Sequence, residues 1–407
     1  MIKSIKLINW KSYGESTLYI DPLTIVIGTN SSGKSNALDA LLFLKRIAGG
    51  AGIFQSINGD VSMKALRGGI DWVCRKYNTS FYIEVLMEFE GNDYEYSIKV
   101  EVEKAKALIV DEKLIQLSRN NRLFYTTLRD QKLLNIPTYF STGKQGKGQN
   151  FDLSRSISIL YQAKSLSLKK KDTIEIVSAI LSQLSGIFVL DPIPSHMRDY
   201  APLAEELLSD GSNIAGVLAA LDDTRKSDIE ETITQYLKKI PEKDVEYIWT
   251  EKIGKFNTDA MLYCKEGWKN ENEHIIDARG MSDGTLRFLA IVTAMLTNEP
   301  FSLLVIEEVD NGLHPSRANV LLNMLKELGE KRKIDVIITT HNPALLDAAG
   351  VSMIPFITVA HRDEEGQSIL TLLEDIEDLP KLISSGNIGE LTSSGKIESA
   401  LLREGLK

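Results

Sequence analysis

Residues Gly28-Thr29-Asn30-Ser31-Ser32-Gly33-Lys34-Ser35 form a glycine-rich motif of the form G-x-x-x-x-G-K-[ST]. The β-branched apolar run at 23–27 predicts a buried strand before it, and the apolar spacing at 36–44 predicts a helix after it. The two glycines let the backbone wrap a phosphate chain, and the helix adds its positive N-terminal end. Lys34 is expected to reach the β- and γ-phosphates, and the hydroxyl of Ser35 to ligate Mg²⁺. The motif therefore predicts the binding of a nucleoside triphosphate.

Bulk composition excludes several other classes of protein. The 407 residues are 43% apolar and 25% charged, which is ordinary for a globular chain. The net charge of −9 argues against a general electrostatic grip on nucleic acid, so any contact with DNA or RNA would need a local basic patch. Cys74 and Cys264 are isolated, as expected in a reducing cytosol. No signal peptide is visible, and Asn298-Glu299-Pro300 interrupts the longest apolar stretch, so we expect a cytoplasmic protein without a membrane span.

The periodicity of the chain predicts three parts. Residues 1–150 read as strands around the P-loop, with a β-hairpin within 81–102 and a loop at 143–149. Residues 151–245 read as a helical insertion for contact with a partner or DNA or for dimerisation, in which Ser227 and Glu230 predict a capping box. Residues 246–407 return to strands and helices, and Asn342 and Pro343 predict the N-cap and the first position of a helix. The run Lys169-Lys170-Lys171 is either a solvated helix face or a contact with nucleic acid.

The C-terminal part carries a second group of candidate site residues. The apolar strand at 303–306 ends in Glu307 and Glu308, at the edge where doubly wound sheets bind ligands. Glu307 is placed to help hold Mg²⁺, and Glu308 to orient and deprotonate an attacking water. His341 ends the next predicted strand and is a candidate sensor of the γ-phosphate. Residues 281–287 open a helix whose first N–H groups could bind an anion.

In their order along the chain these motifs resemble the ABC-type ATPase family. The resemblance is to its RecF, SMC and OLD branch, and within that branch to the short OLD-like ATPases of bacterial anti-phage defence systems. Further supporting stretches are Asn9-Trp10-Lys11-Ser12-Tyr13, Asp210-Gly211-Ser212-Asn213 and the segment 308–315. The resemblance implies an α/β fold of the ABC-type P-loop ATPase head, a mixed sheet with an N-terminal antiparallel part and a helical insertion.

The same resemblance implies a head that dimerises around two ATP molecules with Mg²⁺. Glu308 would be the catalytic glutamate, His341 the switch histidine, and Asp310 part of the dimer seam. Metal ligands would be Ser35 and Glu307. The signature Ser282, Asp283 and Gly284 would touch the γ-phosphate bound by the other subunit. The nucleotide-binding residues would be Gly28, Asn30, Ser31, Ser32, Gly33, Lys34, Ser35, Asn36 and Lys11.

Three departures from the family pattern stand out. Glu307 occupies a position that is usually aspartate, and Asp283 replaces a glycine of the transporter signature. The glutamine that usually contacts Mg²⁺ has no clear counterpart, and Gln55 and Gln116 are the candidates.

OLD proteins carry a C-terminal Toprim nuclease, whereas the 66 residues after His341 contain no strand ending in an Asp-x-Asp pair. We therefore expect an ATPase that is not itself a nuclease, forms at least a dimer and regulates a separately encoded effector in anti-phage defence. The alternative is a RecF- or SMC-like ATP-gated DNA-binding protein in repair or chromosome maintenance. A P-loop GTPase or kinase is disfavoured, because no base-specificity motif or phosphoacceptor site is evident.

Overall fold

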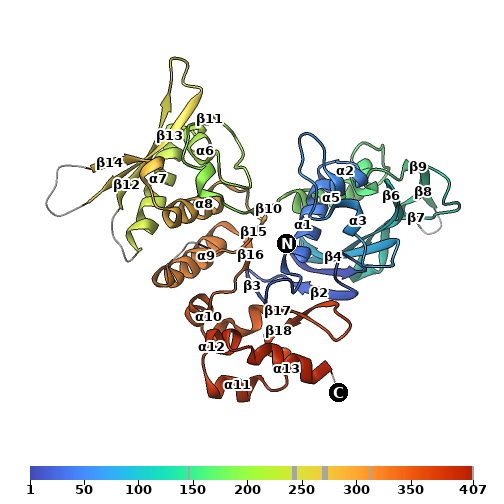
Figure 1. Ribbon diagram of the computed structural model, residues 1–407. Helices are drawn as coiled ribbons and strands as arrows, with labels where there is room; N and C mark the ends of the chain where they lie inside the picture. The colour runs from blue at the N-terminus through green and yellow to red at the C-terminus, as the bar shows by residue number, and fades with distance from the viewer. Residues whose placement is uncertain (145–146, 241–244, 268–273, 312–313, 406–407) are drawn as a thin grey trace.

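A six-stranded sheet forms the centre of the computed structural model, which describes residues 1–144, 147–240, 245–267, 274–311 and 314–405 (Figure 1). Its strand order is β10-β15-β16-β3-β17-β18, all parallel except β18. The strands are β3 (Leu23–Ile27), β10 (Ile187–Leu190), β15 (Leu303–Ile306), β16 (Asp335–Thr339), β17 (Ile357–Arg362) and β18 (Ser368–Leu372). Every residue of β3, β15 and β16 is buried, because layers of structure cover both faces. This is why these strands read as continuous apolar runs.

An eight-stranded antiparallel sheet lies beside the central sheet, in the order β2-β1-β4-β5-β6-β7-β8-β9. Its strands are β1 (Ile2–Ile8), β2 (Glu15–Tyr19), β4 (Ser80–Phe89), β5 (Asn92–Glu103), β6 (Lys106–Gln116), β7 (Asn121–Thr126), β8 (Asn135–Lys144) and β9 (Lys147–Ser154). Phe43 of the P-loop helix packs against Trp10 and Phe81, with ring centroids 5.7 and 5.5 Å away. This aromatic cluster fixes the P-loop helix between the two sheets.

Thirteen helices are present among the described residues: α1 (Lys34–Ala48), α2 (Ile53–Asn58), α3 (Gly69–Trp72), α4 (Ile159–Ala163), α5 (Lys171–Ser185), α6 (Ile214–Ala220), α7 (Asp223–Lys238), α8 (Asp283–Thr297), α9 (Ala318–Arg332), α10 (Pro343–Ala349), α11 (Leu379–Ser385), α12 (Ile388–Ser393) and α13 (Lys396–Gly405). Buried residues of α1 and α5 pack on one face of the central sheet, and those of α8 and α9 on the other. Helix α10 begins as predicted, with Pro343 in its first turn and the Asn342 side chain accepting a hydrogen bond from Ala344 N at 2.9 Å. None of these helices is long and apolar enough to cross a membrane.

A small third sheet contains β11 (Ala201–Pro202), β12 (Val245–Ile253), β13 (Asp259–Glu266) and β14 (His274–Asp277). Helix α7 covers the free edge of β12. Glu230 accepts a hydrogen bond from Thr250 N at 2.7 Å, Thr234 accepts one from Ile248 N at 3.2 Å, and Lys226 donates to Thr250 O. These side chains are spaced four residues apart on one helix face, so they satisfy alternating backbone groups of the strand.

The predicted capping box at Ser227 and Glu230 is therefore wrong. Helix α7 begins five residues earlier, and the Asp222 side chain caps it by accepting a hydrogen bond from Arg225 N at 2.9 Å. Glu230 is free to serve the β12 edge because it lies in the middle of the helix.

The predicted fold class is confirmed, since the structure is an α/β fold with a mixed central sheet and an antiparallel N-terminal sheet. The range 151–245, predicted as a helical insertion, supplies α4 to α7 but also β10 of the central sheet. The predicted loop at 143–149 is wrong for its described residues, since 143–144 belong to β8 and 147–149 to β9, while residues 145–146 lie outside the described residues. The division at 150 and 245 remains a prediction.

Asp335 gives a pH dependence that can be measured. Burial raises its pKa to about 7, an effect that the N-terminal ammonium opposes and Asp21 reinforces. The folded protein therefore holds this proton more tightly than the unfolded chain, so its stabilising contribution is complete below pH about 4 and is lost as the pH rises towards 7. We expect Asp335→Asn to remove this fall and to raise the free energy of unfolding at pH 8 by about 1–3 kcal/mol.

Urea unfolding curves between about pH 4 and pH 8 measure this effect. Asp375→Asn, at an exposed position, is the matched control and should leave the pH dependence unchanged. An equally steep fall in the Asp335 variant and the wild type would contradict the assignment.

Candidate functional site

The P-loop lies between the C-terminal end of β3 and the first turn of α1. Gly28 and Gly33 have φ of 142° and 119°, which favour glycine. A Cβ on Gly28 would lie 2.2 Å from Ala360 O, and one on Gly33 would lie 2.3 Å from Ser368 Oγ. Both glycines are therefore required by the close approach of β17 and β18 as well as by the turn itself.

The back of the loop is held by residues from the β17–β18 hairpin. Ser368 Oγ donates a hydrogen bond to Ser32 O at 2.6 Å, and Arg362 Nε donates one to Ser31 O at 3.0 Å. Asn30 and Ser31 are exposed at the mouth of the loop, whereas Ser32 is buried. The predicted residues thus divide into exposed ones that can face a ligand and a buried one that shapes the loop.

Lys34 bridges the two ends of the loop. Its Nζ donates hydrogen bonds to Gly28 O at 2.6 Å and Thr29 O at 3.0 Å, so the ammonium lies across the mouth of the loop. Burial lowers the pKa of Lys34, and three carboxylates oppose that shift: Glu308, Glu307 and Glu398 of α13. A cation held by carbonyl oxygens in a glycine-rich loop is suited to binding a polyphosphate.

Ser35 and Glu307 meet at the end of β15. Ser35 Oγ donates a hydrogen bond to Glu307 Oε1 at 2.6 Å, and Arg67 Nη2 forms an ion pair with Glu307 Oε2 at 2.5 Å. A hydroxyl and a carboxylate in contact beside the phosphate-binding loop form an oxygen donor set that suits Mg²⁺. The two predicted metal ligands therefore fit the ion that a nucleoside triphosphate brings.

Glu308 follows Glu307 in an unusual backbone conformation. Its φ is 46°, and its N–H donates a hydrogen bond to Thr339 Oγ1 at 2.8 Å. The side chain is exposed, with Asn311 Nδ2 at 3.4 Å from Oε2. Left-handed backbone at a non-glycine residue is uncommon and often marks a functional site. The strained turn keeps the Glu308 carboxylate at the surface, beside the same sheet edge as the P-loop.

His341 lies just beyond β16 and is exposed. Within the described residues its imidazole makes no hydrogen bond, whereas Thr340 Oγ1 accepts one from Asn342 N at 3.0 Å. Parallel pairing of β16 with β3 places His341 at the sheet edge that carries the P-loop. Asp310 is buried, and its Oδ1 has no hydrogen-bond partner among the described residues. Its predicted contact at a dimer seam remains a prediction.

Lys11 and Asn36 stand behind the P-loop. The ammonium of Lys11 is buried in an ion pair with Asp39 and also donates to Arg67 O at 2.7 Å. Asn36 Nδ2 donates to Ser12 Oγ at 2.8 Å. Lys11 therefore anchors the segment that carries Arg67, and its predicted contact with nucleotide remains a prediction.

A cavity of about 1180 Å³ adjoins the loop beside Ser12 and Asn36. Its lining is rich in cations, namely Lys11, Arg67, Arg75, Lys76, Lys104 and Arg362. Two of its aromatic side chains, Trp72 and Tyr77, are 70% and 93% exposed. Cations next to exposed aromatic rings suit a ligand that combines phosphates with a planar base.

The predicted signature opens α8 on the other face of the central sheet. Ser282 is the N-cap, and its Oγ accepts a hydrogen bond from Thr285 N at 3.1 Å. Ser282 and Asp283 are exposed, whereas Gly284 is buried. No hydrogen bond within the described residues joins this turn to the P-loop of the same chain, so the turn is available to another molecule.

Arg198 holds the signature turn in place. Its Nη1 donates to Met281 O at 2.7 Å, Arg279 O at 2.9 Å and Ala278 O at 3.2 Å, and its Nη2 pairs with Asp283 Oδ1 at 2.5 Å. This ion pair explains how a carboxylate can stand in a turn that is predicted to face a phosphate. The charge of Asp283 is matched by Arg198, which leaves Ser282 and the helix N-terminus to face an anion.

Sequence reasoning missed three residues that the structure brings to the site. Arg67 reaches Glu307, Arg198 holds the signature, and Asp191 follows β10 at the same sheet edge. Burial raises the pKa of Asp191, and the charge of Glu307 raises it further, which indicates that the two carboxylates lie close together. Asp191 could have been found, because it ends an apolar run in the manner of Glu307; the two arginines had no local pattern.

Neither candidate glutamine lies at the site. Gln55 accepts a hydrogen bond from Gly52 N at 3.2 Å and donates to Asp60, at the start of α2. Gln116 is buried at the end of β6 and donates to Asn92 at 3.3 Å. Both amides are engaged elsewhere, so neither serves as the Mg²⁺-contacting glutamine.

One solved structure supports the fold, and two further ones are similar at lower scores. The chain is similar to an SMC head bound to the C-terminal winged-helix domain of ScpA, with a TM-score of 0.51 and 14% identity, covering 91% of this chain and 97% of the other. An SMC head with an extended coiled coil from Pyrococcus furiosus, bound to the C-terminal domain of ScpA, gives 0.49 and 12% over 94% and 99%. The SMC head domain from Thermotoga maritima gives 0.43 and 12% over 91% and 98%.

No curated protein matches the sequence. A family model matches residues 23–347, a range that runs from β3 and the P-loop through the signature and the Glu307–Glu308 pair to α10. The chain therefore belongs to the family of AAA domains described as putative AbiEii toxins of type IV toxin–antitoxin systems.

Proposed function

We propose that this protein binds and hydrolyses ATP in a dimer whose two sites are each built from both subunits, and that it regulates a separately encoded effector in anti-phage defence. The dimer part of the proposal rests on one observation, namely that the chain places its candidate phosphate-binding groups at two separate places. Lys34, Ser35 and the two glutamates gather at one sheet edge, while the Ser282 turn is exposed on α8. A second copy would bring its Ser282 turn to the phosphates held by Lys34.

The residues of one chain have separate roles in this proposal. The P-loop backbone and Lys34 hold the phosphates, while Ser35 and Glu307 hold Mg²⁺, which neutralises phosphate charge when it is bound. The Glu308 carboxylate accepts a proton from the attacking water. His341 lies at the same edge and would donate a hydrogen bond to the terminal phosphate. Arg67 would shift from Glu307 towards the phosphates, because a polyphosphate offers it more negative charge.

The effector part of the proposal rests on which side chains of the described residues could hold metal ions. Nucleases that use two metal ions hold these ions about 4 Å apart. They therefore need several carboxylates that converge on both ions. Within the described residues no group of three or more His, Cys, Asp or Glu side chains could hold a metal. The family description, which refers to a toxin–antitoxin system, supports action alongside a second protein.

Purified protein tests this function directly. We expect slow ATP hydrolysis but no cleavage of labelled plasmid or tRNA with Mg²⁺ or Mn²⁺, and we expect effector activity only when the neighbouring gene product is added. Glu308→Gln serves as the matched variant. Cleavage by the pure protein that disappears in this variant would show that the chain is itself a nuclease, and the effector proposal would fall.

The second candidate is an ATP-gated DNA-binding protein of the RecF or SMC kind. The similarity in fold to an SMC head favours it. Stimulation of ATP hydrolysis by duplex DNA, with no effect from the neighbouring gene product, would support this candidate over the first.

A further inference from the structure

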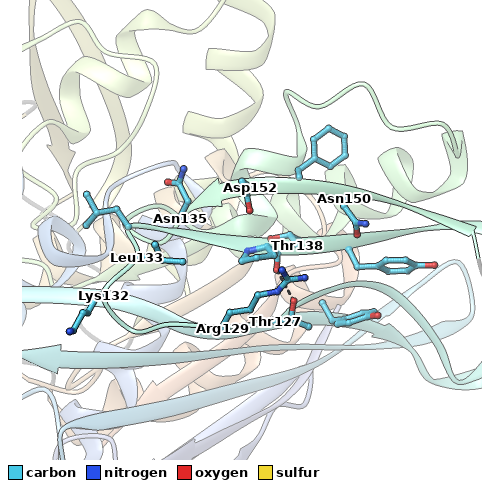
Figure 2. A pocket seen from close by; sticks show the side chains of 13 residues that line it. Thr127, Arg129, Lys132, Leu133, Asn135, Thr138, Asn150 and Asp152 are labelled. Atoms are coloured by element: carbon cyan, nitrogen blue, oxygen red, sulfur yellow. Dashed lines mark hydrogen bonds between the residues drawn. The ribbon is translucent and has the colours of Figure 1, made fainter.

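A groove of about 1000 Å³ lies at the far end of the antiparallel sheet, away from the P-loop (Figure 2). It is formed by β7, β8 and β9 and by the segment between β7 and β8. Figure 2 shows Arg129 and Lys132 on that segment, and Asn150 and Asp152 on β9. The site described above uses none of these residues.

Two tyrosines form a flat platform in this groove. Tyr125 and Tyr139 are paired across β7 and β8, with ring centroids 5.1 Å apart and ring planes inclined by 32°. The guanidinium of Arg122 lies 5.6 Å from the Tyr125 ring. Both rings are partly exposed on the sheet face, so further planar groups could stack on them.

Two cations in the groove are unpaired among the described residues. Neither Arg129 nor Lys132 makes an ion pair or hydrogen bond through its side chain with the described residues, and both are exposed. Asp152 is the one carboxylate in the lining. The lining thus holds two cations and one anion, and Arg122 adds a third cation beside Tyr125, although the whole chain carries a net charge of −9. The groove is thus a local basic patch on an acidic protein.

The basic surface continues past the edge strand β9. Gln149 donates to Ser167 O at 3.2 Å and accepts from Lys169 N at 2.7 Å, so the lysine run 169–171 lies against this strand. Lys169 and Lys171 are exposed, and Lys170 has Asp172 at 3.9 Å. A ligand that leaves the platform across β9 therefore meets this second group of cations.

We propose that this surface binds single-stranded nucleic acid. Successive bases stack on Tyr125 and Tyr139, while Arg129 and Lys132 contact the phosphates. The strand then crosses β9 to the lysines at 169–171. Paired, exposed aromatic rings beside unpaired cations are the features that bind single strands without reading their sequence. A duplex lacks exposed base faces and cannot use the platform.

Fluorescence anisotropy with labelled dT and U oligomers of about 15 nucleotides, without ATP, tests the proposal. We expect the Tyr125→Ala/Tyr139→Ala variant to lose at least about tenfold in affinity, because each stacked base contributes strongly to binding. The Tyr125→Phe/Tyr139→Phe variant keeps the rings and should retain the wild-type affinity. The Arg129→Gln/Lys132→Gln variant should reduce the salt dependence of log K by about 1.4, or about 0.7 per lost phosphate contact.

The matched control is Tyr247→Ala/Trp249→Ala, which removes a stacked aromatic pair on β12 with centroids 5.9 Å apart. It should bind like the wild type, and circular dichroism should show every variant folded. Equal affinity of the wild type and the Tyr125→Ala/Tyr139→Ala variant would overturn the proposal, as would preference for a duplex of the same length. Absence of binding to any oligomer would also overturn it and would leave the groove to a peptide. These measurements need no nucleotide, so they stand apart from the ATPase proposal.

Discussion

Lys34→Ala should weaken ATP binding by about a hundredfold or more while leaving the fold intact. Lys34 is the cation that lies across the mouth of the P-loop, with Nζ 2.6 Å from Gly28 O. Each charge-assisted hydrogen bond lost to a phosphate costs about 1.5–3 kcal/mol, so affinity should fall by about a hundredfold or more. Calorimetric titration with ATP measures the loss, and circular dichroism verifies folding.

Lys326→Ala, at an exposed position on α9, is the control and should bind ATP normally. Unchanged affinity in a folded Lys34 variant would rule out the assigned nucleotide site.

The same Lys34→Ala variant also tests the proposed dimer. Ser282→Arg should block the signature of the subunit that carries it. When this variant is mixed with Lys34→Ala, each heterodimer should keep one intact site, built from Lys34 of one subunit and Ser282 of the other. Random assortment of subunits would restore about a quarter of wild-type hydrolysis, whereas activity no greater than the two variants give alone would contradict a shared site.

Glu308→Gln should bind ATP but cleave it slowly. The substitution keeps the shape of the side chain and removes the carboxylate that we propose accepts the proton from water. General base catalysis contributes about 10²–10⁴-fold, so hydrolysis should fall by orders of magnitude and not by a small factor. Because the uncleaved nucleotide would keep the subunits together, size-exclusion chromatography with ATP should show more dimer than for the wild type.

Glu299→Gln, an exposed glutamate before β15, provides the comparison and should hydrolyse ATP normally. If Glu308→Gln retains wild-type turnover, the base lies elsewhere. Asp191 would then be the next carboxylate to test, because it lies at the same sheet edge.

Where the structure brings predicted site residues together, the prediction depends on local patterns. The P-loop is recognisable because its glycine spacing and the flanking strand and helix lie within about twenty consecutive residues. Ser35 and Glu307 were both assigned to the metal from their positions after a motif and after a strand, and the structure brings them into contact. The N-cap of α10 at Asn342 followed from turn chemistry alone.

The sequence by itself determined the glycine-rich loop, the apolar strands around it and the carboxylates at their ends, because each depends on neighbours a few residues away. Only the tertiary structure decided that Arg67 meets Glu307, that Arg198 holds the signature turn, and that β10 joins the central sheet. Glu230 is a further example. Its spacing from Ser227 predicts a helix cap, whereas in the folded chain it accepts a hydrogen bond from the edge of β12. These contacts join segments far apart in the chain, and which segments meet is fixed by how the sheets and helices bury their apolar faces together.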